Sequence, residues 1–283
     1  MLVIKAPTAG FCMGVSLAVN KLDKALERTK GKNLYTLGPI IHNPRVVREY
    51  EAKGAQCLED HRLAAAGSTV VIRAHGLPRA LEEDLRRHGL NVVDATCPKV
   101  KAAQMGIKKA QAAGLGKLLL FGEKDHPEVR GLLSYAGDDA LVFSNLDDLR
   151  ALPLRPDQPC FAAAQTTQDK NAFADVLDYL KHFLHRPPSV LNTICDATMD
   201  RQNDVLELTR KTRSMVIVGG LNSGNTRRLA DISRQLGIFT VHCESSTDLP
   251  LRRLKDLQPV GLTAGASTPD AHIRAVEKIL LEG

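Results

Sequence analysis

Residues 117–129 have the sequence Lys-Leu-Leu-Leu-Phe-Gly-Glu-Lys-Asp-His-Pro-Glu-Val. The residues before Gly122 form an apolar run typical of a buried strand, and those after it are polar as far as His126. Because proline is favoured in the first turn of a helix, Pro127 predicts that a helix starts directly after His126. A strand, a polar turn and a helix are the building unit of a parallel α/β sheet.

The same pattern occurs twice more in the chain, in Leu-Gly-Pro-Ile-Ile-His-Asn-Pro at 37–44 and in Val-Gly-Gly-Leu-Asn-Ser-Gly-Asn at 218–225. His42, His126 and Ser223 each follow the glycine by four residues, and each follows a cysteine by 28 to 30 residues. Those cysteines are Cys12, Cys97 and Cys195. A second polar cluster comes later in each repeat, at 73–76, 164–167 and 264–267. Repetition on this scale predicts three copies of one supersecondary unit.

We therefore predict an α/β fold of three similar small units with parallel sheets, arranged as a pseudo-threefold trefoil around a central cavity. The predicted units cover residues 1–96, 97–194 and 195–283, and the N-terminal strand, about residues 1–12, packs with the third. The expected strands are 70–72, 117–121, 215–218 and 259–262, and the expected helices are 15–28, 79–88, 99–113, 172–183, 201–212 and 226–236.

Composition narrows the class of protein. The chain has 283 residues, a net charge of +6, 4% aromatic residues and no Trp. The basic balance favours an anionic partner, but Lys and Arg are spread along the chain without interleaved aromatics, which disfavours nucleic acid. No apolar run approaches the length of a membrane span, and the N-terminus lacks the pattern of a secretory signal, so we expect a cytoplasmic protein without a membrane partner.

Six cysteines and no Cys-x-x-Cys pair argue against a disulfide scaffold or a zinc ribbon. The other three cysteines fall outside the repeated positions: Cys57, Cys160 and Cys243. We expect them to act as small apolar residues, and the sequence shows no functional role for them. The three repeated cysteines could converge on one metal centre. Three thiolates suit zinc or an iron–sulfur cluster with one iron that lacks a protein thiolate, and the spacing does not choose between them.

Helix N-termini that follow strands in a parallel sheet attract phosphate groups. The positions of His42, His126 and Ser223 predict three such corners, although caps and turns would use the same residue types. Glu128, in the first turn after His126, is a candidate acid, and the alternative is a glutamate that only stabilises the helix dipole. Hydroxyls at Thr166 and nearby positions could bind phosphate or order a water.

Several segments together make the chain resemble the 4-hydroxy-3-methylbut-2-enyl diphosphate reductase family of the non-mevalonate isoprenoid pathway. They span nearly the whole chain in family order: Ala-Gly-Phe-Cys-Met-Gly-Val (9–15), Leu-Gly-Pro-Ile-Ile-His-Asn-Pro (37–44), Arg-Ala-His-Gly (73–76), Asp-Ala-Thr-Cys-Pro (94–98), His-Pro-Glu-Val (126–129), Ala-Gln-Thr-Thr (164–167), Thr-Ile-Cys-Asp-Ala-Thr (193–198), Asn-Ser-Gly-Asn-Thr (222–226) and Ala-Gly-Ala-Ser-Thr-Pro-Asp (264–270). One departure is Gly224, where some members carry serine, so position 224 offers no side-chain contact here.

The resemblance implies that Cys12, Cys97 and Cys195 bind a 4Fe–4S cluster whose fourth iron is open to substrate or water. It implies reductive dehydroxylation of 4-hydroxy-3-methylbut-2-enyl diphosphate to isopentenyl and dimethylallyl diphosphate, with electrons from a one-electron donor such as ferredoxin or flavodoxin. Glu128 matches the family's proton source and Thr166 lies near the substrate's hydroxyl end. The residues implied to bind substrate are His42, His75, His126, Thr166, Ser223, Asn225 and Ser267.

Two alternatives stay open on the sequence. An iron–sulfur hydro-lyase acting on a small anionic substrate would use the same open iron without net reduction, and it would need no external electrons. A cluster-based sensor or phospholigand-binding protein would not turn over the diphosphate, and it would leave Glu128 without a task. The donor's identity, the oligomeric state and the product ratio are not encoded in any pattern that we can interpret.

Overall fold

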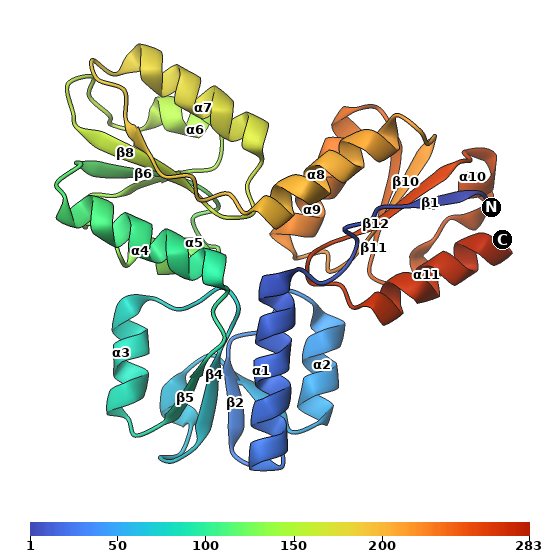
Figure 1. The fold of residues 1–283 in the computed structure, drawn as a ribbon, viewed down its shortest axis with the longest axis horizontal. Helices are drawn as coiled ribbons and strands as arrows, with labels where there is room; N and C mark the ends of the chain where they lie inside the picture. The colour runs from blue at the N-terminus through green and yellow to red at the C-terminus, as the bar shows by residue number, and fades with distance from the viewer. The chain divides into compact units, whose positions relative to one another are not determined.

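The computed structural model describes residues 1–283, which form three four-stranded sheets and eleven α-helices (Figure 1). The chain divides into two compact units. Unit 1 comprises Met1–Ser16, Ile41–Ala52 and Asp196–Gly283, and unit 2 comprises Leu17–Ile40 and Lys53–Cys195. All strand pairs are parallel, so the predicted α/β class with similar parallel sheets is confirmed.

Unit 1 is built on one sheet in the order β1-β12-β10-β11. Its strands are β1 (Val3–Lys5), β10 (Ser214–Val218), β11 (Phe239–Cys243) and β12 (Val260–Ala264). Alternate residues of β10 face opposite sides of this sheet, as the strand geometry requires. Val216 and Val218 pack in one apolar cluster with Ile273, whereas Met215 and Ile217 pack in another with Leu229. Both faces are therefore covered by helices, which explains why residues 215–218 of β10 are all apolar.

Unit 1 contains five helices and one 3₁₀ turn. They are α2 (Pro44–Ala52), α8 (Asp196–Thr209), α9 (Gly224–Gln235), α10 (Leu251–Asp256) and α11 (Asp270–Glu282), with a 3₁₀ turn η2 (Ser246–Asp248). The first strand of the chain, β1, lies at one edge of this sheet and runs parallel to β12, with Val3 opposite Val260.

Unit 2 holds two sheets of the same design, in the orders β3-β2-β4-β5 and β7-β6-β8-β9. The strands of the first are β2 (Leu34–Leu37), β3 (Ala55–Leu58), β4 (Thr69–Ile72) and β5 (Asn91–Asp94), and those of the second are β6 (Lys117–Phe121), β7 (Leu141–Phe143), β8 (Cys160–Ala164) and β9 (Ser189–Val190). The helices are α1 (Met13–Thr29, in this unit from Leu17), α3 (Arg79–Arg87), α4 (Pro98–Ala112), α5 (Pro127–Leu133), α6 (Leu146–Ala151) and α7 (Lys170–Phe183), with a 3₁₀ turn η1 (His61–Leu63).

The second sheet of unit 2 shows why the opening stretch of sequence folds as it does. Leu118 and Leu120 of β6 pack with residues of α4 and α5, whereas Phe121 stacks on Phe173 of α7, with ring centroids 5.9 Å apart. Helices α4 and α7 lie on opposite sides of β6 (Figure 1). The strand is buried on both faces, so its four consecutive apolar residues all have a packing partner. The chain then leaves the sheet at Gly122 and enters α5 at Pro127.

The predicted strands and helices are confirmed, with boundaries shifted by a few residues. The largest shift is in α8, which begins at Asp196, directly after Cys195, and not at Arg201. An acidic residue in the first turn stabilises the helix dipole, and this signal was available in Asp196. The trefoil arrangement and the boundaries near residues 97 and 195 stay predictions. No helix combines the length and the apolar character that crossing a membrane demands.

Candidate functional site

The three repeated cysteines occupy equivalent places at the start of a helix. Cys97 is the N-cap of α4, Cys195 directly precedes α8, and Cys12 directly precedes α1. Each donates its backbone N–H to a carbonyl in the second polar cluster of a sheet. The acceptors are Ala266 for Cys12 at 3.2 Å, Ala74 for Cys97 at 2.9 Å and Thr166 for Cys195 at 2.9 Å. The repeat seen in the sequence is thus a repeat of local geometry.

These positions suit thiolates that bind a metal. The helix N-terminus presents unpaired N–H groups and a positive dipole end, both of which favour an ionised sulfur. At Cys12, the Val15 N–H donates to Sγ at 3.5 Å. None of the three cysteines is in a disulfide and all three are partly exposed, so they are accessible to a metal.

The other three cysteines lie in strands. Cys57 is in β3, Cys160 begins β8 and Cys243 ends β11. Burial raises the pKa of the Cys160 thiol, and burial raises the pKa of Cys243 to about 12. A thiol that does not ionise is a poor metal ligand, which disfavours Cys160 and Cys243 as ligands. Cys57 is partly exposed and differs from the repeated cysteines by its place in a strand.

Glu128 is the most unusual carboxyl group in unit 2, because it is 1% exposed and has no cationic partner among its hydrogen bonds. It lies in the first turn of α5 and faces Thr166, which follows the carboxyl end of β8. The Thr166 N–H donates to Glu128 Oε1 at 2.6 Å, and the Thr166 hydroxyl donates to Oε2 at 3.0 Å. The structure therefore brings together the two residues that we expect to handle the proton.

Burial changes the acidity of this carboxyl group. It raises the pKa of Glu128 from 4.5 to about 7, and the two hydrogen bonds from Thr166 oppose that rise. A carboxyl group with a pKa near 7 can hold a proton and release it under physiological conditions, which is what a general acid requires. A glutamate that only stabilised a helix dipole would be ionised and exposed, so burial disfavours that alternative.

His126 caps α5 and is held in a defined orientation. Its Nδ1 accepts the Glu128 N–H at 3.1 Å, so in the neutral ring the proton is on Nε2. The ring packs edge-to-face on His75, with centroids 5.4 Å apart. His75 follows β4 and His126 follows β6, so histidines from the two sheets of unit 2 meet at this point. Their N–H groups can donate to an anion.

In unit 1, His42 lies one residue before the N-cap of α2. Asn43 fills the cap, since its Oδ1 accepts the N–H groups of Arg45 and Val46 at 3.1 and 3.3 Å. Asn43 Nδ2 also donates to the Ser267 carbonyl at 2.9 Å, and Ser267 Oγ donates to the His42 carbonyl at 3.2 Å. These bonds hold the His42 segment against the end of β12. Asn43 is a positioning residue that the sequence prediction missed, although Asn-Pro before a helix is a recognisable cap.

The N-terminus of α9 offers a second set of hydrogen-bond donors in unit 1. Ser223 caps the helix, and Asn225 is 6% exposed with a buried Nδ2 that has no hydrogen-bond partner. A buried amide donor without an acceptor is costly unless a ligand satisfies it. A Cβ atom at Gly220 would lie 2.7 Å from the His42 carbonyl oxygen, so only glycine allows this loop to approach His42. The loop and the His42 segment are therefore adjacent.

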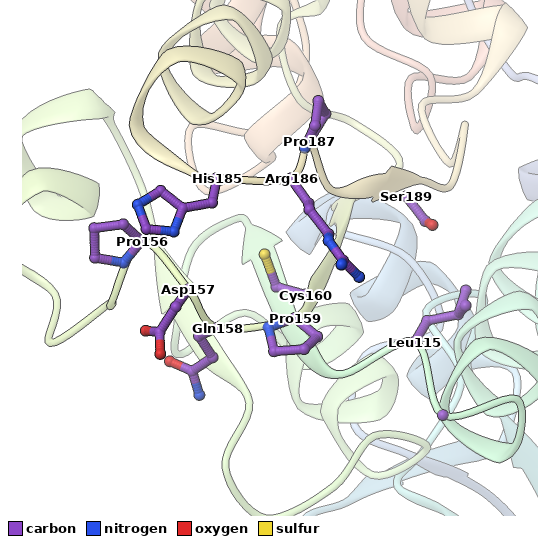
Figure 2. Close-up of a pocket in the computed structure, with 11 residues that line it drawn as sticks. Leu115, Pro156, Asp157, Gln158, Pro159, Cys160, His185, Arg186, Pro187 and Ser189 are labelled. Atoms are coloured by element: carbon purple, nitrogen blue, oxygen red, sulfur yellow. The ribbon is translucent and has the colours of Figure 1, made fainter.

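A separate hollow of about 620 Å³ lies beside the ends at which β8 and β9 of unit 2 begin (Figure 2). Its lining includes Cys160 and Ser189, which begin β8 and β9, with Arg186 beside them. Ligands in parallel α/β sheets bind at the carboxyl ends of strands, where Glu128 and Thr166 lie. The hollow is thus not the candidate site.

Comparison with known proteins gives a consistent picture. A family model described as LytB protein matches residues 3–281. A 4-hydroxy-3-methylbut-2-enyl diphosphate reductase of Nitratidesulfovibrio vulgaris (strain DSM 19637 / Miyazaki F) is 55% identical over 280 residues, with 99% of each chain covered. The reductase of that name from Aquifex aeolicus (strain VF5) is 40% identical and covers 99% of this chain and 96% of its own.

Solved structures agree with the sequence relatives. The structure of E-1-hydroxy-2-methyl-but-2-enyl-4-diphosphate reductase from Plasmodium falciparum matches with a TM-score of 0.93 at 26% identity, covering 99% of this chain and 87% of that one. A structure described as (E)-4-hydroxy-3-methyl-but-2-enyl diphosphate reductase, the terminal enzyme of the non-mevalonate pathway, matches with a TM-score of 0.72 at 39% identity over the full length of both chains.

Proposed function

The chain belongs to the LytB protein family, and on that basis we propose that it reduces 4-hydroxy-3-methylbut-2-enyl diphosphate to isopentenyl and dimethylallyl diphosphate. The observation that carries the proposal is full-length identity of 55% to a reductase of that name. The buried Glu128–Thr166 pair supplies the proton chemistry that such a reaction needs. The balance is two electrons and two protons consumed, one C–O bond broken and one water released.

The electrons require a redox group, and we propose that Cys12, Cys97 and Cys195 hold a 4Fe–4S cluster. The donor set fits, because the three cysteines have equivalent backbone geometry at helix starts, are partly exposed and are not in disulfides. Such a cluster, with one iron lacking a protein thiolate, supplies electrons one at a time and a Lewis acid for an oxygen ligand. Electrons come from a small donor such as ferredoxin or flavodoxin, in the cytoplasm, where thiols stay reduced.

Glu128 supplies the proton for the departing hydroxyl. The Thr166 N–H and the Thr166 hydroxyl each donate to one oxygen of Glu128, and together they fix the direction of the carboxyl group. The hydroxyl is also placed to pass a proton onward. Because Glu128 is buried, bulk water does not compete for that proton. The proton of Glu128 therefore leaves through the Thr166 hydroxyl.

We assign diphosphate binding to the residues that the family resemblance implies, which are His42, His75, His126, Ser223, Asn225 and Ser267. A diphosphate only accepts hydrogen bonds, and three features of the chain donate them. These are the N–H groups at the start of α9, the Asn225 amide and the His126 ring. Thr166 contacts the other end of the substrate.

The activity requires an external reductant, and this requirement tests the proposal. With dithionite as electron source under anaerobic conditions, we expect both diphosphate products and turnover proportional to the reductant consumed. An iron–sulfur hydro-lyase would act without dithionite and yield a dehydrated product at an unchanged oxidation level. Product analysis with and without reductant separates the two activities.

The pH dependence follows from the acidity of Glu128. Its pKa of about 7 means that the carboxyl group is protonated below pH 7 and ionised above it. We therefore expect kcat to fall about tenfold for each pH unit above pH ~8, because only the protonated form donates. A pH–rate profile checks this, with cluster absorbance recorded at each pH to exclude loss of iron. A kcat that stayed level between pH 7 and pH 9 would contradict the acid role.

Asn225 gives a test of the diphosphate site. In Asn225→Ala we expect KM to rise about 10-fold or more with a smaller change in kcat, since a hydrogen bond to a charged group is lost. The inhibition constant of inorganic diphosphate should rise in parallel. The matched control is Asn171→Ala, because Asn171 is also the second residue of its helix, α7, but is exposed. Equal KM values in the two variants would remove Asn225 from the site.

A further inference from the structure

Three side chains that commonly bind metals meet in unit 2 outside the candidate site. They are His61 in η1, Asp84 in α3 and His88, which caps the C-terminus of α3. One ligand atom from each lies within 4.8 Å of those of the other two. Asp84 and His88 are four residues apart, which places them on the same side of the helix. Nothing in the reaction proposed above uses these residues.

His61 is the buried member of the cluster, at 6% exposure. Its Nε2 lies 2.8 Å from Asp84 Oδ2 but lacks the geometry of a hydrogen bond. Its Nδ1 faces the Asp60 carboxylate at 3.7 Å. At 3.7 Å the Asp60 carboxylate is too far away for a hydrogen bond, so it contributes only its charge, and Nε2 is the nitrogen placed to bind an ion beside Asp84.

His88 is the exposed member, and its free nitrogen can be identified. Its Nδ1 lies 2.9 Å from the Asp84 main-chain carbonyl oxygen. A carbonyl only accepts hydrogen bonds, so Nδ1 carries the proton and Nε2 keeps the lone pair in the neutral ring. The ring stands edge-to-face to His61, with centroids 5.0 Å apart. The two rings and the carboxylate thus offer two nitrogen donors and one oxygen donor.

From this geometry we propose that His61, Asp84 and His88 form a binding site for a divalent transition-metal ion, with Zn²⁺ as the preferred ion. Two imidazoles and one carboxylate are a common ligand set for zinc, and water completes the tetrahedron where His88 reaches solvent. Ligand atoms about 2.0–2.2 Å from the ion are roughly 3.3 Å apart in a tetrahedron. The three ligand atoms lie within 4.8 Å of one another, so side-chain rotations have to bring them closer to bind an ion.

The charges around the site allow a cation. Arg62 is paired with Asp60 at 2.7 Å and Arg86 with Glu82 at 3.1 Å, so these two guanidinium groups are already compensated. The one competitor is Arg87, whose Nη2 lies 3.3 Å from Asp84 Oδ1. Arg87 is exposed, and an exposed ion pair of this kind contributes little free energy, so zinc displaces it at low cost.

The ion would join η1, in the connection between β3 and β4, to the end of α3. Binding to the folded state alone raises the apparent stability, so we expect Tm to rise when Zn²⁺ is added. The site lies outside the thiol and diphosphate positions, and its loss is expected to leave turnover unchanged.

The test measures Zn²⁺ bound per chain in the cluster-loaded protein, so that the thiols are already occupied. After dialysis against buffered Zn²⁺, elemental analysis should give one more zinc in the wild type than in His88→Ala. The control is His182→Ala, because His182 lies four residues after Asp178 and contacts its carbonyl at 2.8 Å, as His88 does with Asp84, but has no third ligand. His182→Ala should bind as much zinc as the wild type.

Two further variants keep the result independent of folding. His88→Cys restores a zinc ligand and should recover the stoichiometry, which a merely structural role of His88 would not predict. Asp84→Asn should weaken zinc binding by more than about 100-fold, which exceeds the roughly 10–100-fold effect of changing a residue that only orients a ligand. Equal zinc content in the wild type, His88→Ala and His182→Ala would overturn the proposal, as would a zinc-induced rise in Tm that persists in His88→Ala.

Discussion

In the Glu128→Gln variant, kcat is expected to fall by about 10²–10⁴-fold, which is the usual contribution of a general acid. Glutamine has the same shape and can accept the Thr166 N–H and bond to the Thr166 hydroxyl, so both contacts survive. What the variant lacks is the proton. Because the neutral form of the buried carboxyl group is well populated near pH 7, its replacement by a neutral amide should not unfold the protein.

The measurement is anaerobic turnover with dithionite, together with iron content and visible absorbance. Glu82→Gln is a suitable control, since Glu82 also lies in the first turn of a helix of unit 2 but is held by Lys101 at 3.1 Å and by Arg86. We expect kcat close to the wild type in that control. Turnover near the wild-type value in Glu128→Gln, with its iron retained, would exclude Glu128 as the acid.

The pH profile of the same variant gives an independent check on the assignment. The loss of activity above pH ~8 should disappear in Glu128→Gln, because no group with a pKa of about 7 remains at that position. If the variant kept both the low kcat and the alkaline loss, another group would be responsible for the pH dependence.

The central strands could be predicted from the sequence because they are buried on both faces. Lys117–Phe121 has four consecutive apolar residues and was placed at its observed bounds. The outer strands are different: Ser189–Val190 has two residues and both are exposed, so no apolar pattern distinguishes it from a loop. It exists because its neighbour β8 offers hydrogen-bonding groups along an open edge.

The candidate site shows the same division between local and tertiary information. The helix starts at Pro127 and Ser223 are local signals, and the structure places both where they were expected. Whether Glu128 is an acid or a capping charge depends on its burial and on Thr166, which lies 38 residues away. A single sequence carries no measure of either, so the raised pKa of Glu128 emerges only from the fold.

Replacing Cys97 by serine should remove most of the cluster's absorbance and iron. A hydroxyl is far less acidic than a thiol and is a poor ligand for iron–sulfur clusters, so one of the three proposed ligands is lost. The fold should survive, because Cys97 occupies the N-cap of α4 and makes no capping hydrogen bond there, while serine is among the best N-cap residues. Loss of iron in a variant with an unchanged or higher Tm in the apo form would therefore report on ligation alone.

The matched substitution is Cys57→Ser in β3, at a cysteine that is also partly exposed but lies in a strand. If the division of the cysteines by structural position is right, this variant keeps its full iron content and turnover. Retention of a full cluster in Cys97→Ser, or equal loss in both variants, would remove the ligand assignment. Since Cys12 and Cys195 share the backbone geometry of Cys97, serine at either should repeat the effect, and a cysteine that did not would show that equivalent local geometry is insufficient to define a ligand.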